Sequence, residues 1–142
     1  MSNFDFNRSF GFVLHETARL LSKRYDQRAK SLGLTRAQIQ VLAYLVYHEG
    51  INQAGLAELI EIEPISLARL IDRMEQAGWV ERRPDPRDRR AWRLYITDKA
   101  KPVFAEIIAI GAEVRGEALA GFWEPERDQV MELLMRVRRN RA

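Results

Sequence analysis

The chain has 142 residues, of which 46% are hydrophobic, and its 23 basic and 20 acidic side chains give a net charge of +3. This size and hydrophobic content fit one domain with a hydrophobic core, and the lack of cysteine excludes disulfides, thiolate zinc sites and thiol-based switches. No apolar run approaches the roughly 20 residues of a membrane helix, and the N-terminus lacks the order of a signal peptide, so we expect a cytoplasmic protein without a membrane partner.

Two helices are predicted at the start of the chain. Apolar residues recur at spacings of three and four over residues 7–31, which is typical of an amphipathic helix, and Gly33 ends it. A second helix begins after Thr35, because Thr35 and Gln38 have the spacing of a capping box. Its expected buried stripe consists of Ile39, Leu42, Ala43 and Val46.

Two short helices joined by a tight turn are predicted next. Asn52 is a suitable N-cap for a helix over residues 53–60. Pro64, which has no N–H to lose in a first turn, opens another helix that ends at Gly78. The inner stripe of this helix consists of Leu67, Leu70, Ile71 and Met74. Its outer face carries Pro64, Ile65, Ser66, Ala68, Arg69 and Arg73.

A β-hairpin with a basic connecting loop is predicted after these helices. Residues 79–83 and 92–96 alternate large apolar with polar side chains, which is the period of a strand. Trp79 and Trp92 flank the hairpin and are expected to be its partly buried packing anchors. The loop 84–91 contains turn prolines and a cluster of arginines, so we expect it to be exposed. These arginines are Arg87, Arg89 and Arg90.

Two helices complete the predicted order. Thr97 is expected to cap a helix that runs to about Gly116, and the last helix runs from about Glu124 to Arg139, anchored by Trp123. The apolar residues near the two ends of the chain exceed what one small domain can cover, which predicts a dimer interface. They are Phe4, Phe6, Phe10, Phe104, Ile107, Ile108, Ile110, Phe122 and Trp123.

The two short helices and the hairpin together predict a unit that binds duplex DNA. In a helix-turn-helix the second helix presents one face to its core and the other to the major groove. Arg69 and Arg73 supply donors for guanine or phosphate, and small apolar groups can meet thymine methyls. The arginines of loop 84–91 can reach a minor groove. The residues expected at DNA are Pro64, Ile65, Ser66, Ala68, Arg69, Arg73, Arg87, Arg89 and Arg90.

Around these residues the chain resembles a known protein family. The stretch from Leu56 to Ala100 is similar to the multiple-antibiotic-resistance regulator (MarR) family, near its SlyA-like branch. The most specific part is the segment Asp85-Pro86-Arg87-Asp88-Arg89-Arg90, followed by Leu94-Tyr95-Ile96-Thr97. The earlier segment LTRAQIQVLAYL also fits.

The resemblance covers essentially the whole chain and implies its organisation. It implies one domain over residues 1–142, mainly α with a small β-hairpin wing. Residues of about 34–100 would form the winged helix-turn-helix that binds DNA, and about 4–32 and 101–142 the dimerisation helices. The implied function is that of a sequence-specific transcription regulator, acting as a repressor and as a homodimer on a pseudo-palindromic operator.

Individual roles also carry over from the resemblance. Groove or phosphate contacts are implied for Pro64, Ser66, Arg69 and Arg73. Arg90 would be the minor-groove arginine, and Asp85 and Asp88 would shape the wing, Asp88 through a carboxylate–guanidinium pair. Glu63 and Ile65 depart from the family pattern, because many relatives have polar residues there. A carboxylate near phosphate is repulsive, so the base preference does not carry over.

The last expectations concern an effector, cofactors and functions other than DNA binding. The resemblance implies that a small aromatic or anionic effector binds between the dimerisation and DNA-binding parts, in a pocket lined by His15, Arg36 and Ile39.

His15 and His48 are the only histidines, so no metal or other cofactor is expected. The sequence has no nucleophile elbow, phosphate loop or metal cluster, which excludes an enzyme. The remaining alternative is a winged-helix module that binds proteins and not DNA.

Overall fold

The computed structural model describes residues 4–141, and its elements follow the predicted order. The helices are α1 (Phe10–Ala29), α2 (Arg36–Tyr47), α3 (Gln53–Ile60), α4 (Pro64–Gln76), α5 (Ala100–Ala118) and α6 (Glu124–Arg141). The strands are β1 (Val80–Pro84) and β2 (Trp92–Ile96), and two short 3-10 helices are η1 (Phe6–Arg8) and η2 (Lys30–Leu32). In this part of the chain, no helix is long and apolar enough to cross a membrane.

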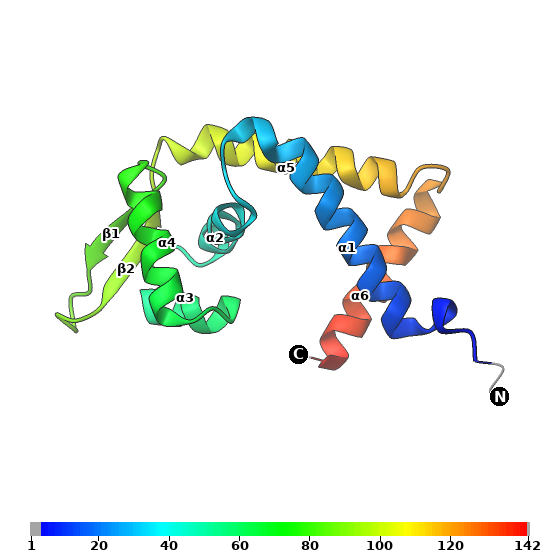
Figure 1. Ribbon diagram of the computed structural model, residues 1–142, viewed down its shortest axis with the longest axis horizontal. Helices are drawn as coiled ribbons and strands as arrows, with labels where there is room; N and C mark the ends of the chain where they lie inside the picture. Colours follow the sequence, from blue (N-terminus) through cyan, green and yellow to red (C-terminus); the bar gives the residue numbers. More distant parts are fainter. Residues whose placement is uncertain (1–3, 142) are drawn as a thin grey trace.

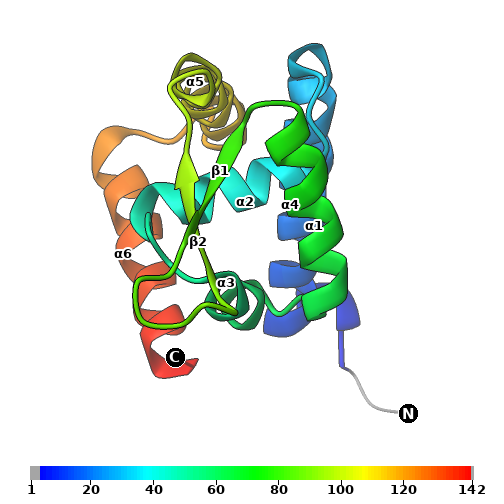
Figure 2. The ribbon, with the colours of Figure 1, turned by 90° about the vertical axis from the view of Figure 1, so that its left-hand side faces the viewer.

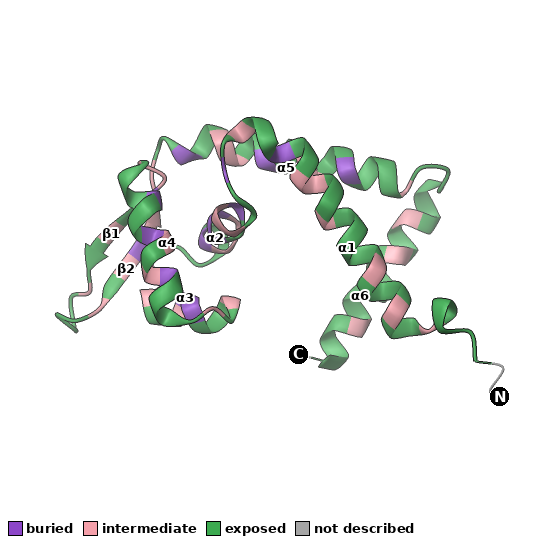
Figure 3. Ribbon diagram, in the orientation of Figure 1, coloured by how far each residue is buried: buried purple, intermediate pink, exposed green. Residues whose placement is uncertain are grey.

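The elements form two lobes that share the long helix α5 (Figure 1). One lobe contains α2, α3, α4 and the hairpin, and the other contains α1 and α6. Buried positions are concentrated in the first lobe and along α5 (Figure 3). The largest fully buried side chains all belong to the first lobe: Val41, Leu42, Leu45, Leu56, Leu67, Ile71, Met74, Val80 and Leu94.

The second helix begins as predicted, and it buries Ile39 and Leu42 as expected but not the whole of the predicted stripe. Thr35 accepts the N–H of Gln38, and the Gln38 side chain accepts the N–H of Thr35, which completes the capping box. Val41 and Leu45 are fully buried beside Leu42. The expectation for Val46 was wrong, since Val46 is 38% exposed in the last turn of α2.

The hairpin is fixed to the segment that precedes α3. In its antiparallel register Val80 lies opposite Ile96, and Pro84 lies opposite Trp92. The N–H of Gly50 donates to the carbonyl of Leu94 at 2.8 Å, and the N–H of Leu94 donates to the carbonyl of Ile51 at 3.0 Å. These bonds hold β2 against the start of the helix-turn-helix, so the hairpin and the two short helices form one unit.

Thr97 does not cap α5 as predicted. The helix begins at Ala100, after Lys99, and Lys99 makes no capping bond with its side chain. The hydroxyl of Thr97 instead donates to the carbonyl of Gly78 at 2.5 Å. Thr97 therefore ties the base of the hairpin to the end of α4, which leaves its side chain unable to reach the first turn of α5.

In the second lobe α1 packs along α5 through polar contacts. Arg24 donates to Glu117 at 2.8 Å, and Arg28 donates to Glu113 at 2.9 Å. The hydroxyl of Tyr25 donates to the carbonyl of Ile107 at 3.2 Å. These contacts connect α1 to α5 on one side and leave much of the apolar surface of this lobe uncovered.

The uncovered apolar surface includes the predicted anchor of the last helix. Trp123 is 68% exposed in the single chain, so the prediction that it anchors the last helix by packing within this chain was wrong. Trp79 is half-buried as expected, and Trp92 is 46% exposed. The large exposed apolar residues of this lobe include Phe6, Phe10, Val13, Leu14, Leu20, Leu21, Phe122, Trp123, Met131, Leu133, Leu134 and Met135.

Candidate nucleic-acid interface

The outer face of α4 is exposed because its inner face packs into the core of the first lobe. Leu67, Ile71 and Met74 are fully buried, and they recur at the spacing of one helix face. Pro64 occupies the first turn, where its missing N–H breaks no helical bond. The exposed residues of the opposite face are Pro64, Ile65, Ser66, Arg69 and Arg73.

Ala68 differs from the other predicted contacts on α4. It is half-buried rather than exposed. Its carbonyl accepts Nη2 of Arg82 at 3.1 Å, so this part of α4 faces the hairpin. Ala68 therefore lies at the border between the outer face of α4 and the strand β1.

We call β1, β2 and the loop 85–91 between them the wing. The loop is shaped by two carboxylates that accept backbone N–H groups two residues later in the chain. Asp85 accepts the N–H of Arg87 at 2.8 Å, and Asp88 accepts the N–H of Arg90 at 2.9 Å. Such short-range bonds are typical of turns that contain aspartate.

The carboxylate–guanidinium pair of the wing involves Asp85, where the family resemblance implied Asp88. Nε of Arg93 lies 3.1 Å from Asp85, whose side chain is only 9% exposed. Asp88 reaches the backbone of Arg90, and Asp88 forms no ion pair with any described residue. The reason is geometric, because the turn directs the Asp88 carboxylate at the N–H of Arg90.

These bonds also perturb the ionisation of Asp85. The N–H of Arg87 has the largest effect, and Arg93 adds to it, so the pKa of the Asp85 carboxyl lies below its usual value. The carboxylate is therefore charged at neutral pH and remains available to hold the wing.

The arginines of α4 and the wing fall into two groups. Arg82, Arg83 and Arg93 belong to the strands, and each pairs with a carboxylate. The side chains in the second group are exposed and pair with no residue in the described part of the chain. They are Arg69, Arg73, Arg87, Arg89 and Arg90.

The unpaired arginines lie on elements that meet at one side of the lobe. A hollow of about 300 Å³ separates the starts of α3 and α4 from the wing. Its lining includes Gln53 of α3, Pro64 of α4, and Arg90 and Trp92 of the wing. Figure 2 shows α3, α4 and the hairpin from this side. The arrangement is that of a winged helix-turn-helix, in which one helix and one hairpin face the same ligand.

Comparison with known proteins agrees with this geometry. A helix-turn-helix transcriptional regulator of Bacillus subtilis (strain 168), YybA, is 32% identical over 136 residues, which are 96% of this chain and 88% of that protein. The profile of the MarR family matches residues 32–91, which contain the helix-turn-helix and most of the wing. The chain belongs to this family.

Solved structures of other transcriptional regulators share the fold. The transcriptional regulator PA3341 is 37% identical, with a TM-score of 0.77, over 93% of this chain and 97% of that one. The transcriptional regulator SlyA is 34% identical, with a TM-score of 0.74, over 90% of this chain and 92% of that one. This protein is accordingly a winged helix-turn-helix transcriptional regulator, as the sequence predicted.

The residues expected to line an effector pocket are not brought together. Arg36 borders a hollow of about 240 Å³ with Leu21, Ser22, Tyr25 and Asp26. Asp26 already accepts Nε of Arg36 at 3.1 Å. The lining of this hollow includes neither His15, which is exposed on α1, nor Ile39, which is buried in the core.

Sequence reasoning missed Arg82, which the structure places between α4 and the wing. Strand alternation was a usable signal, because it puts Arg82 on the same side of β1 as the buried Val80. A charged side chain on a buried face requires partners. The sequence did not identify those partners, since they belong to α3 and α4.

Proposed function

We propose that this protein is a repressor that binds a pseudo-palindromic operator in duplex DNA sequence-specifically as a homodimer. The observation that carries the proposal is the separation of the arginines. The strand arginines are paired with carboxylates, while those on α4 and the wing loop are unpaired and exposed. Unpaired guanidinium groups on convex elements match the geometry and charge of phosphates and base edges.

The two groups of unpaired arginines would read different features of the DNA. Arg69 and Arg73 project from the outer face of α4, which suits contacts to guanine or phosphate in the major groove. Arg90 lies at the tip of the wing beside the start of α4, which suits a minor groove, where narrow segments rich in A·T attract arginine. Ile65 and Ser66 would complete the helix face.

A dimer would bury the apolar surface of the second lobe. A groove of about 590 Å³ between α1 and α6 is lined by Phe10, Val13, Leu14, Val130 and Leu134 among others. The groove belongs to the larger exposed apolar surface of this lobe, and large apolar surfaces are uncommon on monomers and typical of association sites. Two-fold symmetry would then place two α4 helices about one turn of DNA apart.

Effector binding would use the hollow beside Arg36. Arg36 and Tyr25 suit an anionic aromatic molecule, because they offer a guanidinium group and a ring. Such a ligand would compete with Asp26 for Arg36. The hollow lies where α1 meets the start of α2, so its occupation would affect how the two lobes are connected.

Salt dependence tests the proposal that the unpaired arginines neutralise phosphates. Binding of a labelled duplex would be measured by fluorescence anisotropy between 50 and 200 mM salt. If six to ten phosphates are neutralised per dimer, affinity falls by about 10³ to 10⁵ over this range. Binding that did not depend on salt, or no binding to duplex DNA, would contradict the proposal and favour a protein-interaction module.

A further inference from the structure

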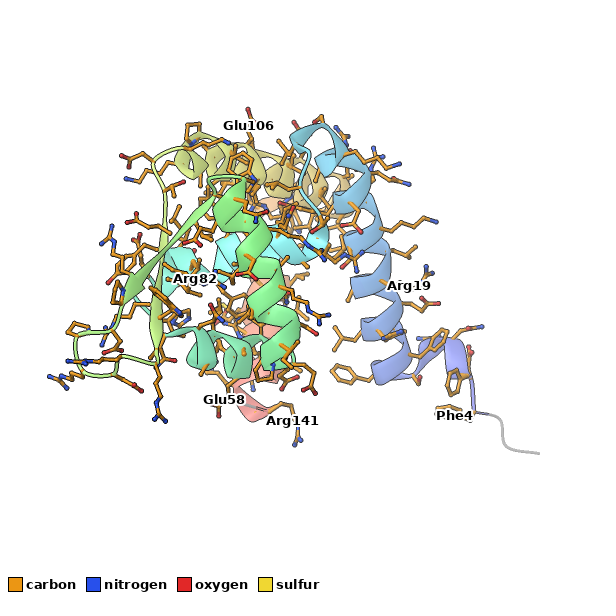
Figure 4. The ribbon with its side chains drawn as sticks, turned by 60° about the vertical axis from the view of Figure 1, so that its left-hand side comes forward. Phe4, Arg19, Glu58, Arg82, Glu106 and Arg141 are labelled. Atoms are coloured by element: carbon orange, nitrogen blue, oxygen red, sulfur yellow. The ribbon has the colours of Figure 1, made fainter. Side chains whose placement is uncertain are left out.

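The side chain of Arg82 joins three elements of the first lobe, namely β1, α3 and α4. It lies on β1 and is 13% exposed. Figure 4 shows it between the hairpin and α4. Its Nε donates to Gln53 of α3 at 3.0 Å, and Nη2 donates to the carbonyl of Ala68 of α4 at 3.1 Å. One guanidinium group therefore joins both helices of the helix-turn-helix to the wing.

Two carboxylates of α4 complete the surroundings of Arg82. Nη1 of Arg82 lies 2.6 Å from Asp72 and 3.3 Å from Glu75. The backbone N–H of Arg82 also donates to Glu75 at 3.1 Å. Asp72 and Glu75 are 58% and 42% exposed, so without Arg82 they would present negative charge beside the outer face of α4.

We propose that Arg82 is a positioning residue for DNA reading, which holds α4 and the wing in one fixed relationship without touching DNA. This inference rests on the proposed function. The planar guanidinium fork matters, because its fixed donors reach α3 and two turns of α4 at the same time, which an ammonium group cannot do. Specific recognition needs α4 and the wing to engage two grooves in register, whereas nonspecific binding needs only positive charge.

The first test compares Arg82→Ala and Arg82→Lys with the wild type in DNA binding. The probes are a duplex that the wild type enriches from random sequences and an unrelated duplex of equal length. We expect Arg82→Ala to weaken binding to the enriched duplex by about 10- to 100-fold and to the unrelated duplex by less than about threefold, since lost register affects only specific contacts. Arg82→Lys keeps the charge but not the fork, so it should remain defective in discrimination.

The salt slope separates positioning from phosphate contact. A phosphate-contacting arginine would lower the slope of log affinity against log salt by about 0.9 for each subunit of the dimer, whereas a positioning residue leaves the slope unchanged. A merely structural loss would reduce the active fraction and weaken binding to both duplexes equally. The matched control is Arg83→Ala, because Arg83 is adjacent on β1 but pairs with Glu81 and covers the ring of Tyr95.

A second measurement needs no DNA. Hydrogen exchange of α4 and β1 should be faster in Arg82→Ala and Arg82→Lys than in the wild type, and unchanged in Arg83→Ala. Unchanged exchange, a reduced salt slope, or wild-type discrimination in Arg82→Lys would overturn the inference while leaving DNA binding intact. A wild type that does not discriminate between duplexes would overturn the proposed function instead, and exchange would still decide whether Arg82 holds α4 to the wing.

Discussion

Asp85 and Arg93 close the base of the wing loop. The Asp85 carboxylate follows β1, and it accepts Nε of Arg93 on β2 at 3.1 Å. The same carboxylate accepts the N–H of Arg87 at 2.8 Å, so it also fixes the first turn of the loop. The exposed arginines of the loop therefore project from a closed turn rather than from a free segment.

Removing this carboxylate should weaken operator binding. Asp85→Ala leaves Arg93 and the N–H of Arg87 without their acceptor, so the loop loses its fixed shape. We expect operator affinity to fall by about tenfold, together with any preference for flanks rich in A·T. Fluorescence anisotropy with flank variants measures both. Asp98→Ala is the control, because Asp98 pairs with Lys101 outside the wing and its loss should leave binding unchanged.

The low pKa of Asp85 gives a prediction for pH. The N–H of Arg87 and the charge of Arg93 favour the ionised carboxylate, so the folded pKa lies below that of the unfolded chain. The resulting stability is present in full above about pH 4 and is lost as pH falls through the folded pKa. The stability difference between the wild type and Asp85→Asn, measured by chemical unfolding, should therefore shrink below about pH 4. A difference that grew with acidity would contradict the assignment.

Arg69 and Arg90 should contribute different information. Arg69→Ala should lower affinity by on the order of 1–3 kcal/mol per half-site and relax the preference at one or two base pairs. Arg90→Ala should weaken binding and reduce the preference for A·T-rich flanks, while central bases keep their effect. Competition between base-substituted duplexes measures both, and circular dichroism checks folding. If Arg90→Ala kept both affinity and flank preference, the role given to the wing tip would be wrong.

The apolar groove between α1 and α6 gives a prediction for assembly. Leu134 lines this groove and is 43% exposed, so Leu134→Glu should place a charge in the dimer interface and dissociate the dimer. Light scattering at micromolar concentration would show the change. Tyr47→Glu is the control, because Tyr47 is 83% exposed on α2, in the other lobe. A folded wild-type monomer at this concentration would contradict the symmetric model of operator binding.

Local signals in the sequence predicted most of the fold. The capping box of Thr35 and Gln38 formed as expected, and Asn52 accepts the N–H of Gly55 at the start of α3. Both depend on residues three apart, which local spacing reveals. The turn between α3 and α4 contains Glu61 in a left-handed conformation with φ of 61°, which the sequence did not signal. Glu61 ends α3 in a left-handed cap, in which its N–H donates to the carbonyl of Glu58 at 3.2 Å and the N–H of Ile62 donates to the carbonyl of Ala57 at 3.0 Å.

Contacts between distant residues could not be predicted in the same way. The alternation of β1 indicates which side Arg82 faces, but Gln53 and Asp72 are brought beside it only by the fold. The pairing of Asp85 with Arg93, where Asp88 had been expected, depends on the shape of the loop. The exposure of Trp123 is a similar case, because periodicity cannot tell a core from an interface with a second chain.

The most direct test of the central claim is a selection of random duplex DNA with the wild-type protein, followed by sequencing. The account predicts an enriched inverted repeat whose half-site centres lie about 10 base pairs apart, since two α4 helices would enter successive major grooves on one side of the duplex. Flanks rich in A·T should accompany it where the wings reach the minor groove. Enrichment of no motif, or of a single site without a repeat, would contradict sequence-specific binding by a symmetric dimer.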